Sequence, residues 1–134
     1  MIRGLMHIGV YTLDIETSIR FYVDKLGFEL TWRGVVNHQT GQLPVATVRA
    51  GSCVIELVCP ADLSRVVAVD GAVQHIALLT DDLVKTAAAL RQRQVPIEEG
   101  ISEIDYEGGV RHLFIRGPSR ERIEIGEYLP RAAE

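Results

Sequence analysis

The sequence has only two cysteines, two lysines and few aromatic residues among its 134 residues. It also lacks long hydrophobic segments: no uninterrupted apolar run exceeds about four residues, far short of the roughly 20 that a membrane-spanning helix needs. We therefore expect no membrane segment. Residues 1–7 lack the apolar run of a secretory signal, and we expect a cytoplasmic protein.

The two cysteines are not expected to pair with each other. Cys53 and Cys59 lie six positions apart in one predicted strand or at its end, which separates their Cα atoms by roughly 20 Å. That distance is too long for a disulfide. Two free thiols agree with a reducing compartment.

The charges argue against nucleic acid as a partner. The net charge is −4, from 14 basic and 18 acidic residues, and no basic stripe is present. All basic residues except Lys25 and Lys85 are arginines. Because the guanidinium group binds carboxylates and phosphates at two points, an anionic small-molecule substrate would suit these arginines. A compositional preference for arginine over lysine is the alternative interpretation.

The chain contains an internal repeat. Its length fits one domain, and its 47% hydrophobic and 24% charged residues are ordinary for a globular protein. Three residue types recur at a single offset of 68 positions in similar local contexts. The recurring pairs are His7 and His75, Asp14 and Asp82, and Glu56 and Glu124. The shared offset indicates a duplication.

The first half of the chain has the pattern of a strand, a helix and three more strands. Asp14 is a good N-cap for the helix, and Gly27 is placed to end it in a left-handed conformation. The apolar stripe of this helix consists of Ile15, Ile19, Tyr22 and Leu26. The predicted strands are 5–12, Phe28–Arg33, Val45–Ala50 and Cys53–Val58.

The second half repeats this pattern. Asp81 or Asp82 caps the second helix, and Val95–Pro96 ends it. Its apolar stripe consists of Leu83, Ala87 and Leu90. The predicted strands are one around His75, a weaker one within Val95–Tyr106, and Val110–Arg116 and Arg122–Tyr128.

These elements predict an α+β fold of two tandem βαβββ modules that form a curved mixed sheet around a cleft. The predicted first module spans residues 1–60, a connector 61–72, the second module 73–129 and a tail 130–134. We expect the modules to form one duplicated domain, because about 60 residues would be marginally stable alone.

Both repeated histidines and both repeated glutamates fall on one predicted sheet face. Because side chains alternate along a strand, branched aliphatic residues occupy the other face of the four strands concerned. Two imidazoles and two carboxylates form a nitrogen and oxygen donor set that suits Ni²⁺, Co²⁺, Zn²⁺ or Mn²⁺. The sequence therefore predicts a divalent metal site made of His7, Glu56, His75 and Glu124. The cysteines have the opposite parity and are not expected to be ligands.

A purely structural interpretation of the four residues is the alternative. In it, Glu56 and Glu124 occupy the solvent face of half-exposed strands, and each histidine is an ordinary sheet residue. This interpretation explains neither the common offset nor the common face of the four side chains. We therefore favour the metal site.

The sequence resembles the vicinal oxygen chelate superfamily over nearly its whole length. The motifs that carry the resemblance are His7-Ile8-Gly9-Val10, the helix segment from Ser18 to Phe28, Val54-Ile55-Glu56-Leu57, His75-Ile76-Ala77-Leu78, and Gly117-Pro118 before Arg122-Ile123-Glu124. The superfamily includes glyoxalase I, methylmalonyl-CoA epimerase, extradiol dioxygenases, and fosfomycin- and bleomycin-resistance proteins. The resemblance implies two βαβββ modules around a divalent metal, in a homodimer.

The resemblance also implies a role for each of the four residues. The ligand order of glyoxalase I is His, Glu, His, Glu, and it falls on His7, Glu56, His75 and Glu124. In such enzymes a proton α to a carbonyl is removed, and the ion stabilises the resulting enediolate. Glu124 is the candidate base, and Glu56 would act on the opposite face. A thiol co-substrate is a further implication.

Three residues outside the four are candidates for substrate contacts. Tyr11 stands near the position where glyoxalase I has an arginine that holds glutathione. His38 stands in the segment where the epimerase has an acidic base, and histidine can serve as a base near neutral pH. Arg116 would meet the phosphates of an acyl-CoA.

The leading hypothesis is a metal-dependent lyase or isomerase of the glyoxalase I type. The first alternative is an enzyme that resembles methylmalonyl-CoA epimerase and acts on an acyl-CoA thioester. The second is a metal-free protein that binds a small molecule, as bleomycin-resistance proteins do. The aromatic content of 6% argues against the second alternative, because it offers little stacking surface.

Overall fold

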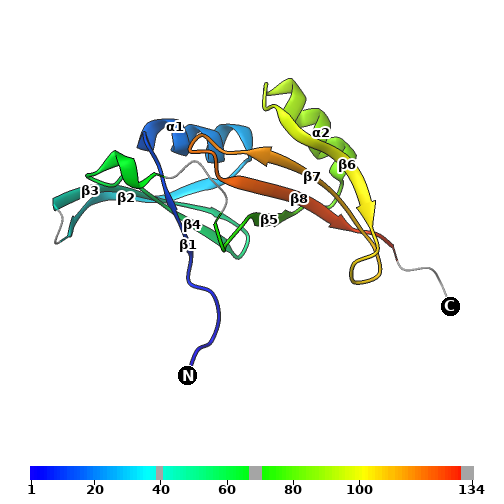
Figure 1. Ribbon diagram of the computed structural model, residues 1–134, viewed down its shortest axis with the longest axis horizontal. Coiled ribbons are helices and arrows are strands. Elements are labelled where there is room, and N and C mark those ends of the chain that lie inside the picture. Colours follow the sequence, from blue (N-terminus) through cyan, green and yellow to red (C-terminus); the bar gives the residue numbers. More distant parts are fainter. Residues whose placement is uncertain (39–40, 67–70, 131–134) are drawn as a thin grey trace. The chain divides into compact units, whose positions relative to one another are not determined.

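A computed structural model describes residues 1–38, 41–66 and 71–130 of the chain, with the backbone alone of His38. The chain divides into two compact units, Met1–Ala68 and Val69–Glu134, each with its own four-stranded sheet (Figure 1). The predicted α+β class and the tandem βαβββ pattern are confirmed. Parts of the predicted connector and tail, residues 67–70 and 131–134, lie outside the described residues. No helix in the described ranges is long and apolar enough to cross a membrane.

The first module is a mixed sheet with a helix over one face (Figure 1). Its elements are β1 (Ile8–Tyr11), α1 (Ile15–Arg20), the π-helical turn η1 (Phe21–Lys25), β2 (Glu29–His38), β3 (Gly41–Ala50), β4 (Cys53–Val58) and the short helix η2 (Leu63–Arg65). The strand order is β1-β4-β3-β2. Strand β1 runs parallel to β4, and the other neighbours are antiparallel.

The second module repeats this topology. Its elements are β5 (Ile76–Leu79), α2 (Leu83–Gln92), β6 (Ile97–Ile104), β7 (Val110–Arg116) and β8 (Arg122–Tyr128). The strand order is β5-β8-β7-β6, and β5 runs parallel to β8. Strands β4, β7 and β8 have the bounds that the sequence predicts.

The repeat extends to hydrogen bonds that the sequence analysis does not identify. A threonine follows the first strand of each module, and its N–H donates to a carbonyl of the last strand at 2.9 Å in both modules. Its hydroxyl bonds a hydroxyl in the helix that follows. The oxygen atoms are 2.6 Å apart between Thr12 and Ser18, and 2.7 Å apart between Thr80 and Thr86. Both modules therefore fix the strand-to-helix junction in the same way.

The predicted aliphatic faces form the two cores. Ile55 and Leu57 of β4, Ile123 of β8 and Leu83 of α2 are fully buried. Full burial of one such side chain contributes about 1.5–3 kcal/mol to stability. The core side of each sheet is thereby fixed, and the repeated histidines and glutamates are left on the other side.

The first helix differs from its prediction in its last turns. Instead of continuing as an α-helix, the chain forms a wider turn in which the Leu26 N–H donates to the Phe21 carbonyl at 3.2 Å. Tyr22 in this turn is fully buried, and its ring lies edge-on to that of Phe28 at 5.4 Å. Gly27 ends the segment with a φ of +79°, as predicted.

Three predicted strands have other lengths in the structure. The first strand is shorter than residues 5–12, whereas β2 and β3 extend past the predicted Arg33 and Val45. Gly34 and Pro44 are poor strand formers, which explains the short prediction. The two strands nevertheless pair with each other out to His38 opposite Gly41. Cross-strand pairing therefore outweighs local propensity here.

A buried carboxyl group lies in the turn between β7 and β8. Oε1 of Glu121 accepts the Ser119 N–H at 3.1 Å, whereas Oε2 is buried without a hydrogen-bond partner in the described part of the chain. Burial raises the pKa of Glu121 to about 7. Gly117 leaves room for this side chain, since a Cβ at that position would collide with it.

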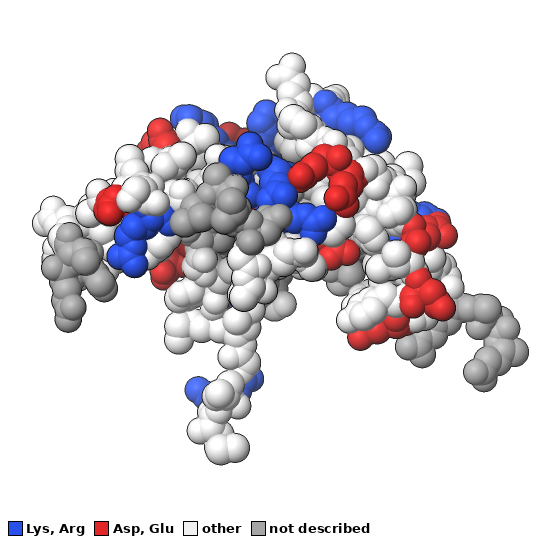
Figure 2. Space-filling model, in the orientation of Figure 1, with Lys and Arg blue, Asp and Glu red and all other residues white. Residues whose placement is uncertain are grey.

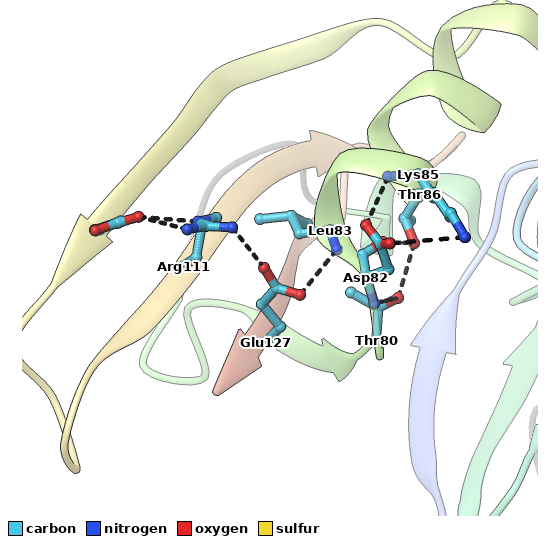
Figure 3. Close-up of polar contacts among 8 residues, drawn as sticks. Thr80, Asp82, Leu83, Lys85, Thr86, Arg111 and Glu127 are labelled. Carbon is cyan, nitrogen blue, oxygen red and sulfur yellow. Dashed lines mark hydrogen bonds and ion pairs between the residues drawn. The ribbon is translucent and has the colours of Figure 1, made fainter. Parts of the chain in front are cut away.

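Replacing the N-cap of α2 should destabilise the protein. Asp82 accepts the Lys85 N–H at 3.0 Å (Figure 3), so Asp82→Ala is expected to lower the free energy of unfolding by about 1 kcal/mol. The neighbouring exposed Asp81 is the control, because Asp81→Ala removes the same charge but not the cap. Urea unfolding measures both variants. Equal losses would contradict the capping role.

Replacing Glu121 should change the pH dependence of stability. Its folded-state pKa of about 7 lies above the ordinary 4.5, so the folded protein binds this proton more tightly than the unfolded chain. Stability is therefore lost as pH rises from about 4.5 through about 7. Glu121→Gln should gain on the order of 1–3 kcal/mol over the wild type between pH 5 and pH 8. Urea unfolding at both pH values tests this, and the same gain in the control Glu29→Gln would contradict it.

Candidate metal-binding site

The first module places His7 beside Glu56. Because β1 and β4 run parallel in register, Gly9 stands opposite Glu56, and His7 precedes Gly9 by two residues on the same side. Nε2 of His7 lies 3.5 Å from Oε2 of Glu56. The two side chains are 35% and 33% exposed, so the pair is open to a ligand.

The second module places His75 beside Glu124 by the same register. Ala77 stands opposite Glu124, and Nε2 of His75 lies 3.1 Å from Oε2 of Glu124. His75 is 36% exposed, but Glu124 is only 16% exposed. This pair is therefore closer and more enclosed than the first.

A hydrogen bond to Gln74 orients His75. Oε1 of Gln74 lies 2.8 Å from Nδ1 of His75 and accepts a hydrogen bond from Nη1 of Arg122 at 3.1 Å. Because an amide oxygen only accepts, the proton of the neutral imidazole belongs on Nδ1. Nε2 then directs its lone pair to the side of Glu124, as a metal ligand requires.

Aromatic contacts add to the support of the second pair. The guanidinium carbon of Arg122 lies 3.7 Å from the ring centre of Phe114, and the Phe114 ring is edge-on to His75 at 5.8 Å. In the first module, Met6 and Val54 occupy the repeat positions of Gln74 and Arg122. Neither of these side chains can supply the amide hydrogen bond or the guanidinium contact found in the second module.

The donor set of the two pairs fits a divalent ion. Two ligand atoms at about 2.1 Å from one ion and at right angles to each other lie about 3 Å apart, close to the separations within the pairs. In the described part of the chain, His, Cys, Asp and Glu side chains form no group of three or more that could hold a metal ion. The structure thus assembles the pairs within each module, and the four-residue site is a prediction.

A hollow lies beside each pair. In the first module it measures about 720 Å³ and is lined by Glu56 and Tyr11, with the apolar side chains of Val45 and Val58. In the second module it measures about 550 Å³, and its lining includes His75 and Glu124. Both volumes lie within the usual range of small-molecule pockets.

The predicted substrate residues have different surroundings. Tyr11 lines the first hollow, where the guanidinium of Arg65 lies 5.9 Å from its ring centre. Arg116 donates to Glu98 at 2.7 Å and to the Arg120 carbonyl at 3.0 Å. The side chain of His38 lies outside the described residues. A contact of Tyr11, Arg116 or His38 with a substrate remains a prediction.

Trp32 is a candidate ligand contact that the sequence analysis does not identify. It stands opposite Thr47, which in turn stands opposite Glu56, so all three share one sheet face. Leu30, two residues earlier, stands opposite the buried Val48 on the other face. A β-bulge between Leu30 and Trp32 reverses the alternation, and a simple period of two therefore assigns Trp32 to the wrong face.

Both cysteines are free thiols. Burial raises the pKa of each, and the nearby Asp14 carboxylate contributes at Cys59. Cys53 belongs to the same alternation as the buried Ile55 and Leu57, opposite in parity to Glu56. Neither thiol belongs to the His–Glu pair of its module.

Comparisons of the sequence with known proteins identify relatives. A sequence profile of the Glyoxalase/Bleomycin resistance protein/Dioxygenase superfamily matches residues 4–125. The chain is 33% identical over 129 residues to a protein of Bacillus subtilis (strain 168) named "Uncharacterized protein YwbC", over 93% of this chain and 98% of that protein.

Solved structures share the fold. The glyoxalase family protein from Enterococcus faecalis has a TM-score of 0.75 and 18% identity, over 93% of this chain and 98% of that chain. TnmS3, an antibiotic binding protein from Streptomyces sp. CB03234, has a TM-score of 0.66 and 20% identity, over 96% and 98%. The profile matches most of the sequence, and the tandem βαβββ topology agrees with it. The chain therefore belongs to the Glyoxalase/Bleomycin resistance protein/Dioxygenase superfamily.

Proposed function

We propose that the chain is a metal-dependent lyase or isomerase of the glyoxalase I type. It would hold one divalent ion, such as Ni²⁺, Co²⁺, Zn²⁺ or Mn²⁺, through His7, Glu56, His75 and Glu124. The observation that carries the proposal is the equivalent contact of a histidine with a glutamate in both modules, at 3.5 and 3.1 Å. Two such pairs supply the N/O donor set that these ions favour.

The reaction would move a proton next to a carbonyl group. When bound, the ion would polarise a substrate oxygen and so acidify the hydrogen on the neighbouring carbon. Glu124 would take this proton, since it lines the hollow of its module and is held beside His75. Glu56 lines the other hollow and would act on the opposite face of the substrate.

Two alternatives share the same fold. An epimerase acting on an acyl-CoA thioester would use the same proton transfer. A metal-free binding protein would use the hollows alone, and the antibiotic-binding TnmS3 has this fold. Superfamily members bind small molecules and often form dimers, and we propose a homodimer for this chain. A thiol co-substrate belongs to the glyoxalase I version only.

Metal binding is the first test. The wild type should bind one Ni²⁺, Co²⁺ or Zn²⁺ per chain, and Glu124→Gln should weaken binding at least about tenfold, because a ligand charge is lost. Elemental analysis after gel filtration and calorimetric titration measure this. The exposed Glu29 provides the control Glu29→Gln, which should bind like the wild type. A wild type that binds no ion would contradict the proposal.

Activity separates the enzyme hypotheses. The loaded protein should convert methylglyoxal in the presence of a thiol, and Glu124→Gln should lower kcat about 10²-fold or more, because the base is lost. A fully loaded protein that is inactive with every thiol tested would contradict the glyoxalase I version. Deuterium incorporation at the α-carbon of methylmalonyl-CoA would assign the epimerase. Unchanged ligand affinity in Glu56→Gln/Glu124→Gln, with no metal bound, would assign the binding protein.

Gln74 should strengthen metal binding through His75. Gln74→Leu removes the acceptor of the Nδ1 proton, and we expect metal affinity to fall about tenfold. The ¹⁵N imidazole spectrum of the metal-free Gln74→Leu variant should also show a mixture of His75 tautomers. Gln92→Leu, at the exposed end of α2, is the control. An unchanged tautomer in Gln74→Leu would contradict the orienting role.

A further inference from the structure

We propose that the hollow of the second module binds a neutral, apolar part of the substrate, an aromatic or branched aliphatic group next to the reacting carbonyl. This inference rests on the proposed function, because His75 and Glu124 form part of the lining. The sequence analysis considers an anionic substrate. The present inference is that the part of the substrate in this hollow is uncharged.

Four large apolar side chains in the lining of the hollow are exposed to solvent. Leu79, Tyr128, Tyr106 and Ile104 are 72%, 59%, 56% and 47% exposed, and all four line this one hollow. Large apolar side chains gathered at this exposure mark a binding surface. The volume of about 550 Å³ suits a small molecule.

The charges around the hollow do not suit an anion. No lysine or arginine is among the described residues that line it. Glu127 also lines it, but its oxygens accept the Leu83 N–H at 3.0 Å and Nη1 of Arg111 at 3.1 Å (Figure 3). Glu124 is the remaining carboxylate. Away from the proposed metal ion, a negatively charged group in this hollow would therefore meet a carboxylate and no lysine or arginine side chain.

Three arginines on the strands of this module, Arg111, Arg116 and Arg122, are paired with glutamates. Arg111 also donates to Glu103 at 2.8 Å, and Arg116 donates to Glu98 at 2.7 Å. On the face shown in Figure 2, basic and acidic side chains lie next to one another. Binding phosphates or carboxylates would require these arginines to leave their partners, which the apolar group we propose does not.

Two small residues open the hollow beside the ligand pair. Ala77 of β5 stands opposite Glu124, and Gly126 follows Glu124 by two residues on the same face of β8. A larger side chain at either position would occupy the space next to Glu124. The surroundings of Gly126 allow a Cβ, because the nearest atom would be 3.5 Å away. Both positions therefore provide variants that fill the hollow and leave the core unchanged.

A pair of matched dyes tests the proposal on the full chain. N-phenyl-1-naphthylamine is neutral, and 8-anilino-1-naphthalenesulfonate has the same rings with an added sulfonate. Fluorescence titration should show the neutral dye bound at least about tenfold more tightly. Ala77→Leu and Gly126→Val should each weaken its binding about tenfold or more. The exposed Ala88 of α2 provides the control Ala88→Leu, which should bind the dye like the wild type.

The outcomes separate this inference from the proposed function. The inference would be overturned if the sulfonate dye bound more tightly than the neutral dye, or if Ala77→Leu bound the neutral dye as tightly as Ala88→Leu. Neither result would contradict the proposed metal binding. Neutral-dye binding without any metal binding would support the hollow and contradict the enzyme. If the wild type binds neither dye and Ala77→Leu turns a dimer into a monomer by light scattering, a second chain covers the hollow, and the inference is wrong.

Discussion

The parallel pairing of the first and last strands in each module positions the candidate site. Residues of a parallel pair keep a fixed register, so the residue opposite the glutamate is Gly9 in one module and Ala77 in the other. The histidine two positions earlier then lies on the same face. The chain between the two parallel strands contains the helix, which covers the aliphatic face, and the two other strands of the sheet. Core and ligand face are thus set by one connection.

The two pairs differ although their backbones repeat. Gln74 and Arg122 support His75, and Glu124 is more enclosed than Glu56. Both modules have the backbone hydrogen bond from the threonine to the last strand, whereas the exposed Met6 stands at the repeat position of Gln74. The second pair is accordingly the more preorganised, and the first is the more accessible to solvent.

Much of the fold follows from local sequence patterns. The cap at Asp14, the left-handed Gly27 and the bounds of β4, β7 and β8 are all predicted, because capping, glycine and alternation are local effects. The face of Trp32 is not, because a bulge depends on the pairing of two strands. Alternation places the histidine and the glutamate of each module on one face, but their contact depends on the parallel pairing of two strands. A four-residue site depends on further contacts that a repeat alone does not specify.

The hydroxyl pairs at the strand-to-helix junctions have a practical consequence. Thr80 follows His75 by five residues and is bonded to Thr86 in the first turns of α2. Any shift of the strand on ligand binding would pass through this short connection to the helix. The backbone resonances there would then report occupancy of the second pair from outside it, and those near Ser18 would report the first pair separately. The backbone resonances at each junction would thus report on the His–Glu pair of their own module.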